Sequence, residues 1–293
     1  MTRQFQPRRA LGHTGFVATQ LGIGDIADRN VPLKDCVATI HRALDAGLNL
    51  IDTAPSYETG YSEEIVGAAL QGRREGVFLI DKIDDLEAPV APQVEASLKR
   101  LGTEPDLFVF HGVSTLEQWH KLRFDELTGW KGISCHNPAV LAEAIPSGLC
   151  DVVMFPVGPY VDDRYVTEML PLARGHGVGT VCFKTFGAGK LLGDTEGYNQ
   201  PLSNRPRGKL SSGGSDAGAA TLPRLSVAEC LHYTLTYDPD VALLGMSFPN
   251  EQDAAFAAAR QFKPMTAAQM AEVKRRAVVA IRDKGRVWWN PAV

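Results

Sequence analysis

The chain has 293 residues, of which 44% are hydrophobic and 22% charged, and 30 basic against 34 acidic side chains give a formal net charge of −4. This composition is typical of a soluble globular protein, and the slight acidic excess argues against a nucleic acid or an anionic membrane as partner. No run of residues has the apolar length of a membrane span, and the N-terminus lacks the apolar core of a secretory signal, so we expect a cytoplasmic location. Five cysteines without a C-x-x-C pair and seven histidines without a metal-ligand spacing indicate reduced thiols and no metal site.

Short apolar runs alternate with helix-like segments along the chain. The first segment, Arg8–Thr19, contains a Gly-His-Thr-Gly turn that is typical of a β-hairpin. In the second of the helices that follow, the Ser-Glu-Glu opening predicts a cap at Ser62 and acids in the first turn. A last helix, Thr266–Asp283, precedes a tail that ends at Val293. The predicted strand and helix pairs are Val17–Gly24 with Leu33–Ala46, Leu48–Asp52 with a helix from Ser62, Val77–Lys82 with Pro92–Leu101, Asp106–His111 with a helix from Thr115, Lys131–Ser134 with a helix after Pro138, Asp151–Phe155 with Asp163–Gly175, Val178–Phe183 with Leu225–Tyr237, and Val241–Gly245 with Glu251–Arg260.

This alternation predicts an α/β fold. The strands are short and apolar on both faces, as in a parallel sheet that helices cover. Eight such units in one chain favour a (β/α)8 TIM barrel over a doubly wound sheet, and no G-x-G-x-x-G motif follows an early strand. We therefore expect one barrel domain over residues 1–293, with an N-terminal β-hairpin and an extra C-terminal helix. The glycine-rich segment 187–223 is predicted to be a flexible flap loop near the carboxyl ends of the strands.

Four chemically active residues follow the predicted strands. Asp52, Lys82 and His111 end the second, third and fourth strands, and Tyr57 lies in the loop after Asp52. Because the active site of a barrel lies at the carboxyl ends of its strands, we expect these side chains to converge. Lys82, held by Asp52, would lower the pKa of the Tyr57 phenol, and Tyr57 would then act as a general acid toward a carbonyl oxygen while His111 orients the substrate.

The same residues carry a resemblance to a known family. The run IDTAPSYETGYSEEIVG, residues 51–67, resembles the D-T-A-x-x-Y…S-E-x-x-[IL]-G segment of the aldo-keto reductases, and LIDK, SLKRLGTEPDLFVFHGV, KGISCHN and FGAGKLL follow in family order. The resemblance covers residues 8–265, and it extends to a bacterial branch of which some members carry an iron–sulfur tail that is absent here. It implies an NAD(P)(H)-dependent oxidoreductase that transfers a hydride between the nicotinamide and a small aldehyde, ketone or sugar. Asp52, Tyr57, Lys82 and His111 would form the catalytic tetrad.

The resemblance also implies positions for cofactor and substrate. Trp288 of the tail would join Tyr57 and His111 around the substrate, and Phe183 would stack on the nicotinamide. The turn after the seventh strand would hold the pyrophosphate through backbone N–H groups and cationic side chains. Most members of the family use NADP(H), which favours that cofactor here. Met246 and Gln252, however, stand where many members have Lys and Arg against the 2′-phosphate, so NAD(H) remains open. The implied cofactor positions are Ser134, Met154, Phe183, Lys184, Gly187, Gly189, Lys190, Ser247 and Gln252.

Two other functions remain open from the sequence. One is a barrel lyase that uses Lys82 as a Schiff-base nucleophile, although a lysine paired with Asp52 is a poor nucleophile. The other is a regulator that binds a nucleotide on the same fold without catalysis, against which the intact set of four polar residues argues. The sequence indicates neither the individual substrate, nor the physiological direction of the reaction, nor the oligomeric state.

Overall fold

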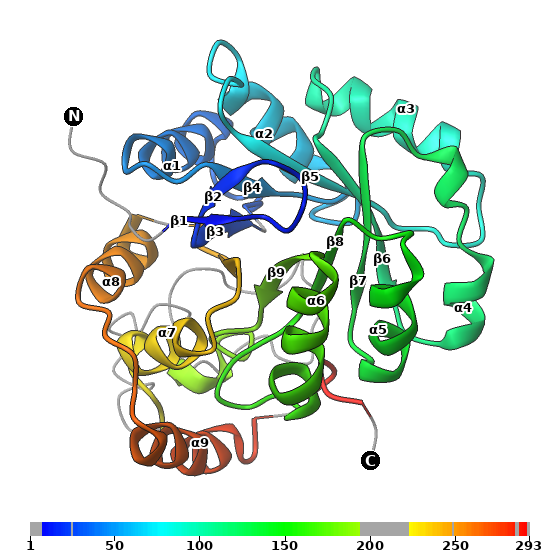
Figure 1. Ribbon diagram of the computed structural model, residues 1–293. Coiled ribbons are helices and arrows are strands. Elements are labelled where there is room, and N and C mark those ends of the chain that lie inside the picture. Colours follow the sequence, from blue (N-terminus) through cyan, green and yellow to red (C-terminus); the bar gives the residue numbers. More distant parts are fainter. Residues whose placement is uncertain (1–7, 25, 194–222, 248, 285–286, 292–293) are drawn as a thin grey trace.

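The computed structural model describes residues 8–24, 26–193, 223–247, 249–284 and 287–291, and its centre is a closed parallel barrel (Figure 1). The strands follow one another around the barrel in chain order, and the last one, β10, pairs with the first one, β3, to close it. The barrel strands are β3 Leu21–Gly24, β4 Leu50–Asp52, β5 Phe78–Ile83, β6 Leu107–Val113, β7 Trp130–Cys135, β8 Val152–Pro156, β9 Gly179–Phe183 and β10 Val241–Leu244. The predicted (β/α)8 barrel is confirmed.

The predicted N-terminal hairpin is present and closes one end of the barrel. Strands β1 Arg8–Ala10 and β2 Val17–Thr19 pair antiparallel, and Leu11 packs with the apolar side chains inside the barrel. Gly12, with φ +50°, makes this close approach possible, because a Cβ there would lie 2.2 Å from the backbone nitrogen of Gly179. The first barrel strand was predicted to begin at Val17, which is wrong, because Val17–Thr19 belongs to the hairpin.

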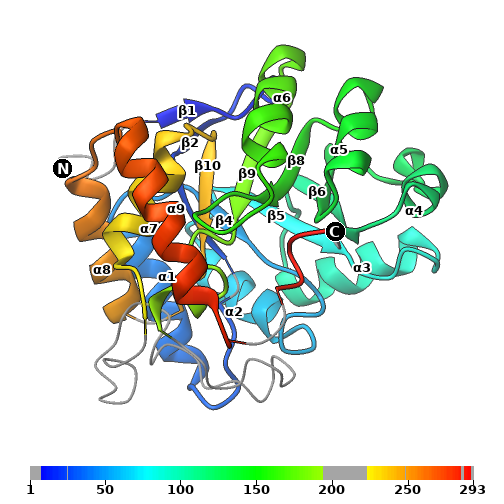
Figure 2. The ribbon, with the colours of Figure 1, turned by 90° about the horizontal axis from the view of Figure 1, so that it is seen from below.

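A ring of helices surrounds the barrel, and α9 packs outside the ring against α7 (Figure 2). The expected extra C-terminal helix is therefore present. Among the described helices, none combines the length and the apolarity that crossing a bilayer requires. The helices are α1 Leu33–Asp45, α2 Tyr61–Leu70, α3 Val90–Leu101, α4 Leu116–Lys121, α5 Pro138–Ala144, α6 Leu170–His176 with a π-helical turn Tyr165–Met169 before it, α7 Val227–Thr236, α8 Pro249–Arg260 and α9 Ala267–Ile281, with short 3-10 turns at Phe124–Glu126, Ile145–Ser147 and Lys190–Leu192.

The start of α2 differs from its prediction. Its N-cap is Gly60, with φ +85°, and Ser62 lies inside the helix, where its hydroxyl accepts a hydrogen bond of 2.8 Å from Thr53 Oγ1. The predicted cap at Ser62 is therefore wrong, because the buried hydroxyl holds the helix to the end of β4 instead. The predicted first-turn acids are present, and one of them, Glu63, is buried and pairs at 2.5 Å with Arg100 of α3.

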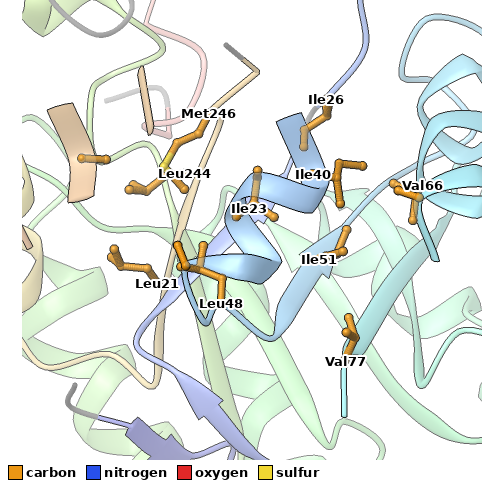
Figure 3. Close-up of a cluster of buried hydrophobic side chains, with 14 of the residues drawn as sticks. Leu21, Ile23, Ile26, Ile40, Leu48, Ile51, Val66, Val77, Leu244 and Met246 are labelled. Atoms are coloured by element: carbon orange, nitrogen blue, oxygen red, sulfur yellow. The ribbon is translucent and has the colours of Figure 1, made fainter. Parts of the chain in front are cut away.

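Two apolar layers form the core, and they determine which side chains reach the carboxyl end of the barrel. Figure 3 shows part of the outer layer, where Ile51 of β4 packs among side chains of α1, α2 and β10. Leu50 lies in the inner layer, so by the alternation along a strand Asp52 also faces the interior. The same alternation on β5 turns Ile80 and Lys82 inward and Asp81 outward, toward the helices.

The predicted flap, 187–223, falls mostly outside the described residues, which resume at Pro223. Its first part, residues 187–193, forms a buried turn that includes Lys190–Leu192. The ammonium of Lys284 donates hydrogen bonds of 2.7 Å to the carbonyl of Lys190 and 3.0 Å to that of Pro223. The C-terminal part of the chain thus holds together both described ends of this segment.

Candidate active site

The buried ion pair of Lys82 and Asp52 lies at the carboxyl end of the barrel. Lys82 Nζ is 2.6 Å from Asp52 Oδ1 and 2.6 Å from the carbonyl oxygen of Thr53, and both charged side chains are only 2% exposed. Each charge compensates the other in a place where an isolated charge would be costly. The ammonium therefore has a defined position between β4 and β5.

Tyr57 and His111 complete a cluster around this pair. Lys82 Nζ lies 4.7 Å from the centroid of the Tyr57 ring, and the imidazole of His111 meets the same ring edge-on, with 5.8 Å between centroids. After Tyr57 the backbone takes positive φ values of 51° at Glu58 and 55° at Thr59, which is a strained conformation for residues other than glycine. The structure thus brings together the four residues that were predicted to converge.

Asp84, which follows β5, connects this cluster to the loop that carries Tyr57. Its carboxylate accepts hydrogen bonds from the backbone N–H and the hydroxyl of Ser56, at 2.6 and 3.2 Å, and is also within hydrogen-bond distance of Nδ1 of His111. Burial alone would raise the pKa of Asp84, but its contacts with His111 and Ser56 hold that pKa below its ordinary value.

A second group of side chains lies beside the first, at the ends of β7 and β9. The ring of Phe183 meets the imidazole of His136 edge-on at 5.3 Å, and Lys184 Nζ is 5.6 Å from the Phe183 ring and 5.6 Å from the ring of Trp288. His136 is also close enough to His111 for the two imidazoles to interact electrostatically. Ser134 and Met154, paired in register on β7 and β8, lie buried in the barrel near these ends.

The backbone of the turn after β9 does not offer the predicted anion-binding donors. The N–H groups of Gly187, Gly189 and Lys190 donate to the carbonyls of Lys184, Phe186 and Gly187, at 2.8, 3.0 and 3.1 Å. These donors are already used within the turn, so their predicted role in binding a pyrophosphate is not supported. The side chain of Lys190 is buried, with Nζ 5.3 Å from the ring of Trp288.

The predicted residues on the adenine side do not join this group. Gln252 is completely buried in α8, and its amide donates a hydrogen bond of 2.8 Å to the carbonyl of Thr39 in α1. This side chain holds two helices together, and its role as a cofactor ligand stays a prediction. Met246 is buried in the outer core layer, as Figure 3 shows, while Ser247 beside it is half-buried.

The two tryptophans of the tail lie in different environments. The indole N–H of Trp289 donates to the carbonyl of Tyr160 at 2.9 Å, and the side chain is fully buried. Trp288 is half-buried beside Lys184, so it is the one of the pair that lies next to the candidate site. Among the described residues, no group of three or more His, Cys, Asp or Glu side chains is arranged to hold a metal ion.

His136 is a residue of this site to which sequence reasoning gave no role. Its only signal is its place directly after β7, in the run KGISCHN. Burial, and then the positive charges of Lys184 and His111, lower the pKa of His136 to about 3. The imidazole is therefore neutral at physiological pH, and its contact with Phe183 is that of an uncharged ring.

The protonation state of His136 leads to a direct prediction. Because burial disfavours the cation, the ring signals of His136 should show no titration between pH 5 and pH 8 in an NMR series. The His136→Gln variant assigns these signals by their disappearance. A His136 signal that titrates within this range would show that the ring is open to water and not packed against Phe183.

The family assignment rests on the match of the whole barrel. Residues 18–276 match the Aldo/keto reductase family. The chain belongs to this family. The resemblance that the run at residues 51–67 indicated is thereby confirmed.

Three proteins of known sequence or structure illustrate how similar this chain is to its relatives. The chain is 28% identical over 195 residues to the uncharacterized oxidoreductase YqkF of Bacillus subtilis, covering 59% of this chain and 63% of that protein. It is 43% identical over 82 residues to the methylglyoxal reductase YeaE of Escherichia coli, covering 27% and 29%. Both matches span less than two thirds of the relative. The solved holo structure of aldo-keto reductase AKR11C1 from Bacillus halodurans has 25% identity and a TM-score of 0.68, covering 94% of this chain and 98% of that one.

Proposed function

We propose that the protein is an NAD(P)(H)-dependent oxidoreductase that interconverts a small carbonyl compound, an aldehyde, ketone or sugar, with its alcohol. The observation that supports this most is the position of Tyr57, whose ring contacts both the buried ammonium of Lys82 and the imidazole of His111. A phenol next to a fixed positive charge is suited to donate and take back a proton at a carbonyl oxygen.

The described residues fit the nicotinamide end of such a cofactor. Phe183 offers an aromatic ring at the end of β9, and the ammonium of Lys184, next to it, is suited to a phosphate. A bound nicotinamide nucleotide supplies the hydride. NADP(H) is the expected form by family habit, and NAD(H) remains the alternative because Gln252 and Met246 are buried and offer no cation for a 2′-phosphate.

The protein residues handle the proton. In the direction of reduction, the hydroxyl of Tyr57 donates its proton to the carbonyl oxygen and becomes a phenolate. Lys82, fixed by Asp52 and the carbonyl of Thr53, stabilises that negative charge without having to move. His111 lies at the edge of the same ring and orients the oxygen that receives the proton.

The geometry argues against the lyase that the sequence left open. Lys82 Nζ donates to Asp52 and to Thr53, so it is a bound ammonium and not a neutral amine ready to attack a carbonyl carbon. Lysine nucleophiles are activated by a lowered pKa, which a neighbouring carboxylate opposes. Failure to trap a covalent adduct with borohydride in the presence of substrate would agree with this reading.

Calorimetric titration with NADPH and with NADH tests the proposal. We expect saturable binding of at least one of them, with one site per chain. The preferred nucleotide is then offered with a panel of carbonyl compounds that includes methylglyoxal, a simple ketone and an aldose, and the nicotinamide absorbance reports turnover. Absence of binding by both nucleotides would overturn the proposal.

A further inference from the structure

We propose that Asp84 is a positioning residue that holds His111 in one tautomer and fixes the loop that carries Tyr57. The inference rests on the proposed function in so far as it concerns catalysis. It is independent of the proposed function in so far as it concerns the tautomer. No motif of the sequence pointed to this role.

The position of Asp84 follows from that of β5. Lys82 faces the interior of the barrel, and Asp84 lies two residues further on, just after the strand ends at Ile83, at the carboxyl end of the barrel. From there its carboxylate reaches two other segments. It contacts Ser56 in the loop after β4 and His111 near the end of β6, which are 28 and 27 residues away in the sequence.

The two carboxylate oxygens of Asp84 have separate partners. Oδ2 accepts the backbone N–H of Ser56 at 2.6 Å, and Oδ1 contacts both Nδ1 of His111 and, at 3.2 Å, the hydroxyl of Ser56. Ser56 immediately precedes Tyr57. One side chain therefore fixes the backbone next to the proposed proton donor and the imidazole that lies against its ring.

The charge of Asp84 decides which nitrogen of His111 carries a hydrogen. Burial opposes ionisation, but the contacts with His111 and Ser56 outweigh it and hold the pKa of Asp84 below its ordinary value. The carboxylate is therefore ionised at neutral pH and can only accept hydrogen bonds. It follows that Nδ1 of His111 is the donor, whichever charge state the ring has.

This assignment leaves Nε2 of His111 for a ligand. None of the described residues forms a hydrogen bond with Nε2, while Nδ1 is held by Asp84. A neutral His111 then accepts a hydrogen bond through Nε2, as an alcohol substrate requires, and a protonated His111 donates one, as a carbonyl oxygen requires. The titratable groups that face this ring are Asp84, Tyr57 and His136.

The test compares Asp84→Ala and Asp84→Asn with Asp85→Asn. Asp85 is a suitable control because it is the next residue and, among the residues that the structure describes, its carboxylate accepts hydrogen bonds only from the backbone N–H groups of Glu87 and Ala88 in its own turn. Nitrogen-15 NMR of histidine-labelled protein at alkaline pH reports the tautomer of each neutral ring, and His111→Asn assigns the signals. Thermal unfolding shows that each variant is folded.

We expect the wild type and the Asp85→Asn variant to show His111 protonated at Nδ1, and Asp84→Ala to shift toward the Nε2-protonated tautomer. In Asp84→Ala, kcat should fall on the order of 10²-fold, the effect of misplacing a reacting group, while nucleotide affinity stays the same. Asp84→Asn should lie between them, since its single amide oxygen can stand in the place of Oδ1, which contacts His111, or of Oδ2, which accepts the backbone N–H of Ser56, but not of both.

Two results would overturn the inference. One is a His111 tautomer in Asp84→Ala that equals that of the wild type. The other is a changed tautomer with unchanged kcat, which would show that the orientation of His111 does not matter for turnover. If the wild type reduced no carbonyl compound, the proposed function would fail, and the NMR comparison would still decide whether Asp84 sets the tautomer.

Discussion

Replacing Tyr57 with phenylalanine is expected to lower kcat for carbonyl reduction by about 10²–10⁴-fold, the usual contribution of a general acid. The variant keeps the ring that contacts Lys82 and His111 and removes only the hydroxyl that carries the proton. Its folding and its affinity for the nucleotide should therefore match those of the wild type. Steady-state kinetics, calorimetric titration and thermal unfolding measure the three quantities on the same preparation.

Tyr61→Phe is the matched control for this variant. Tyr61 starts α2, four residues after Tyr57, and its hydroxyl makes a long hydrogen bond of 3.4 Å to the carbonyl of Val31. Loss of this hydroxyl removes one tyrosine oxygen from the same region without touching the cluster around Lys82. Full turnover by Tyr57→Phe, with Tyr61→Phe also active, would contradict the proposed role of Tyr57.

Lys82 is a poorer first target than Tyr57, although it is as central to the proposal. Removing one partner of a buried ion pair leaves the other charge uncompensated, at a typical cost of about 3–5 kcal/mol. A Lys82→Met variant would leave Asp52 in that state, because both side chains are only 2% exposed. A loss of activity in this variant could then result from unfolding as well as from the loss of the ammonium.

The sequence was sufficient to place Asp52, Lys82 and His111 together because their position depends only on strand order and on the alternation of side chains. Each stands at or near the end of a buried strand, and parallel strands of a barrel end at the same rim. Tyr57 was placed with them because it lies in the loop directly after Asp52, and the resemblance to a family motif then added its role in the catalytic tetrad. The barrel followed from the alternation of strands and helices, and the hairpin from its Gly-His-Thr-Gly turn.

The roles of other residues depended on contacts that no local pattern contains. Asp84 bonds to Ser56 and His111, which belong to two other strand–helix units, so its function appears only when three segments meet. Gln252 was aligned with a cofactor ligand, but its side chain turns toward α1 and is buried there. The backbone N–H of Gly187 was expected to bind a pyrophosphate, but in the folded turn it donates a hydrogen bond to the carbonyl of Lys184.

Asp81→Asn is expected to remove a large pH dependence of stability. Asp81 faces outward from β5 into the contact with α2 and α3, and it is fully buried there without a hydrogen bond of good geometry to any described residue. Burial, and then the negative charge of Glu63, raise the pKa of Asp81 to about 8 from an ordinary value of 3.8. The nearby ammonium of Lys82 and hydroxyl of Ser97 oppose this shift but do not cancel it.

The direction of the effect follows from the protons bound in each state. Between pH of about 4 and about 8 the folded protein holds a proton on Asp81 that the unfolded chain has released, so rising pH favours unfolding. The wild type therefore loses about 1.4 kcal/mol per pH unit from this group across that range. Below the range both states are protonated, and above it both are ionised, so the contribution levels off at either end.

Denaturant unfolding of the wild type and of Asp81→Asn at a series of pH values measures this contribution as a difference. Asparagine stays neutral at every pH. The free energy of unfolding of the variant, relative to that of the wild type, should therefore increase as the pH rises and become constant above a pH of about 8. Asp45→Asn is the surface control, since the carboxylate of Asp45 is exposed and pairs with Arg73, and its loss should change stability by less than about 1 kcal/mol. A difference between Asp81→Asn and wild type that is the same at every pH would mean that Asp81 is already ionised in the folded protein.

Measurement of kcat distinguishes an effect of Asp81 on stability alone from a direct role of Asp81 in the active site. Asp81 and Lys82 are neighbours on β5, but their side chains lie on opposite faces of the strand, so only the charge of Asp81 can reach the ion pair with Asp52. At neutral pH most of that charge is absent, because a pKa of about 8 keeps the carboxyl mainly protonated. Asp81→Asn should therefore keep the wild-type kcat at neutral pH while it changes the pH dependence of unfolding, and a loss of kcat there would place an ionised Asp81 behind the lysine.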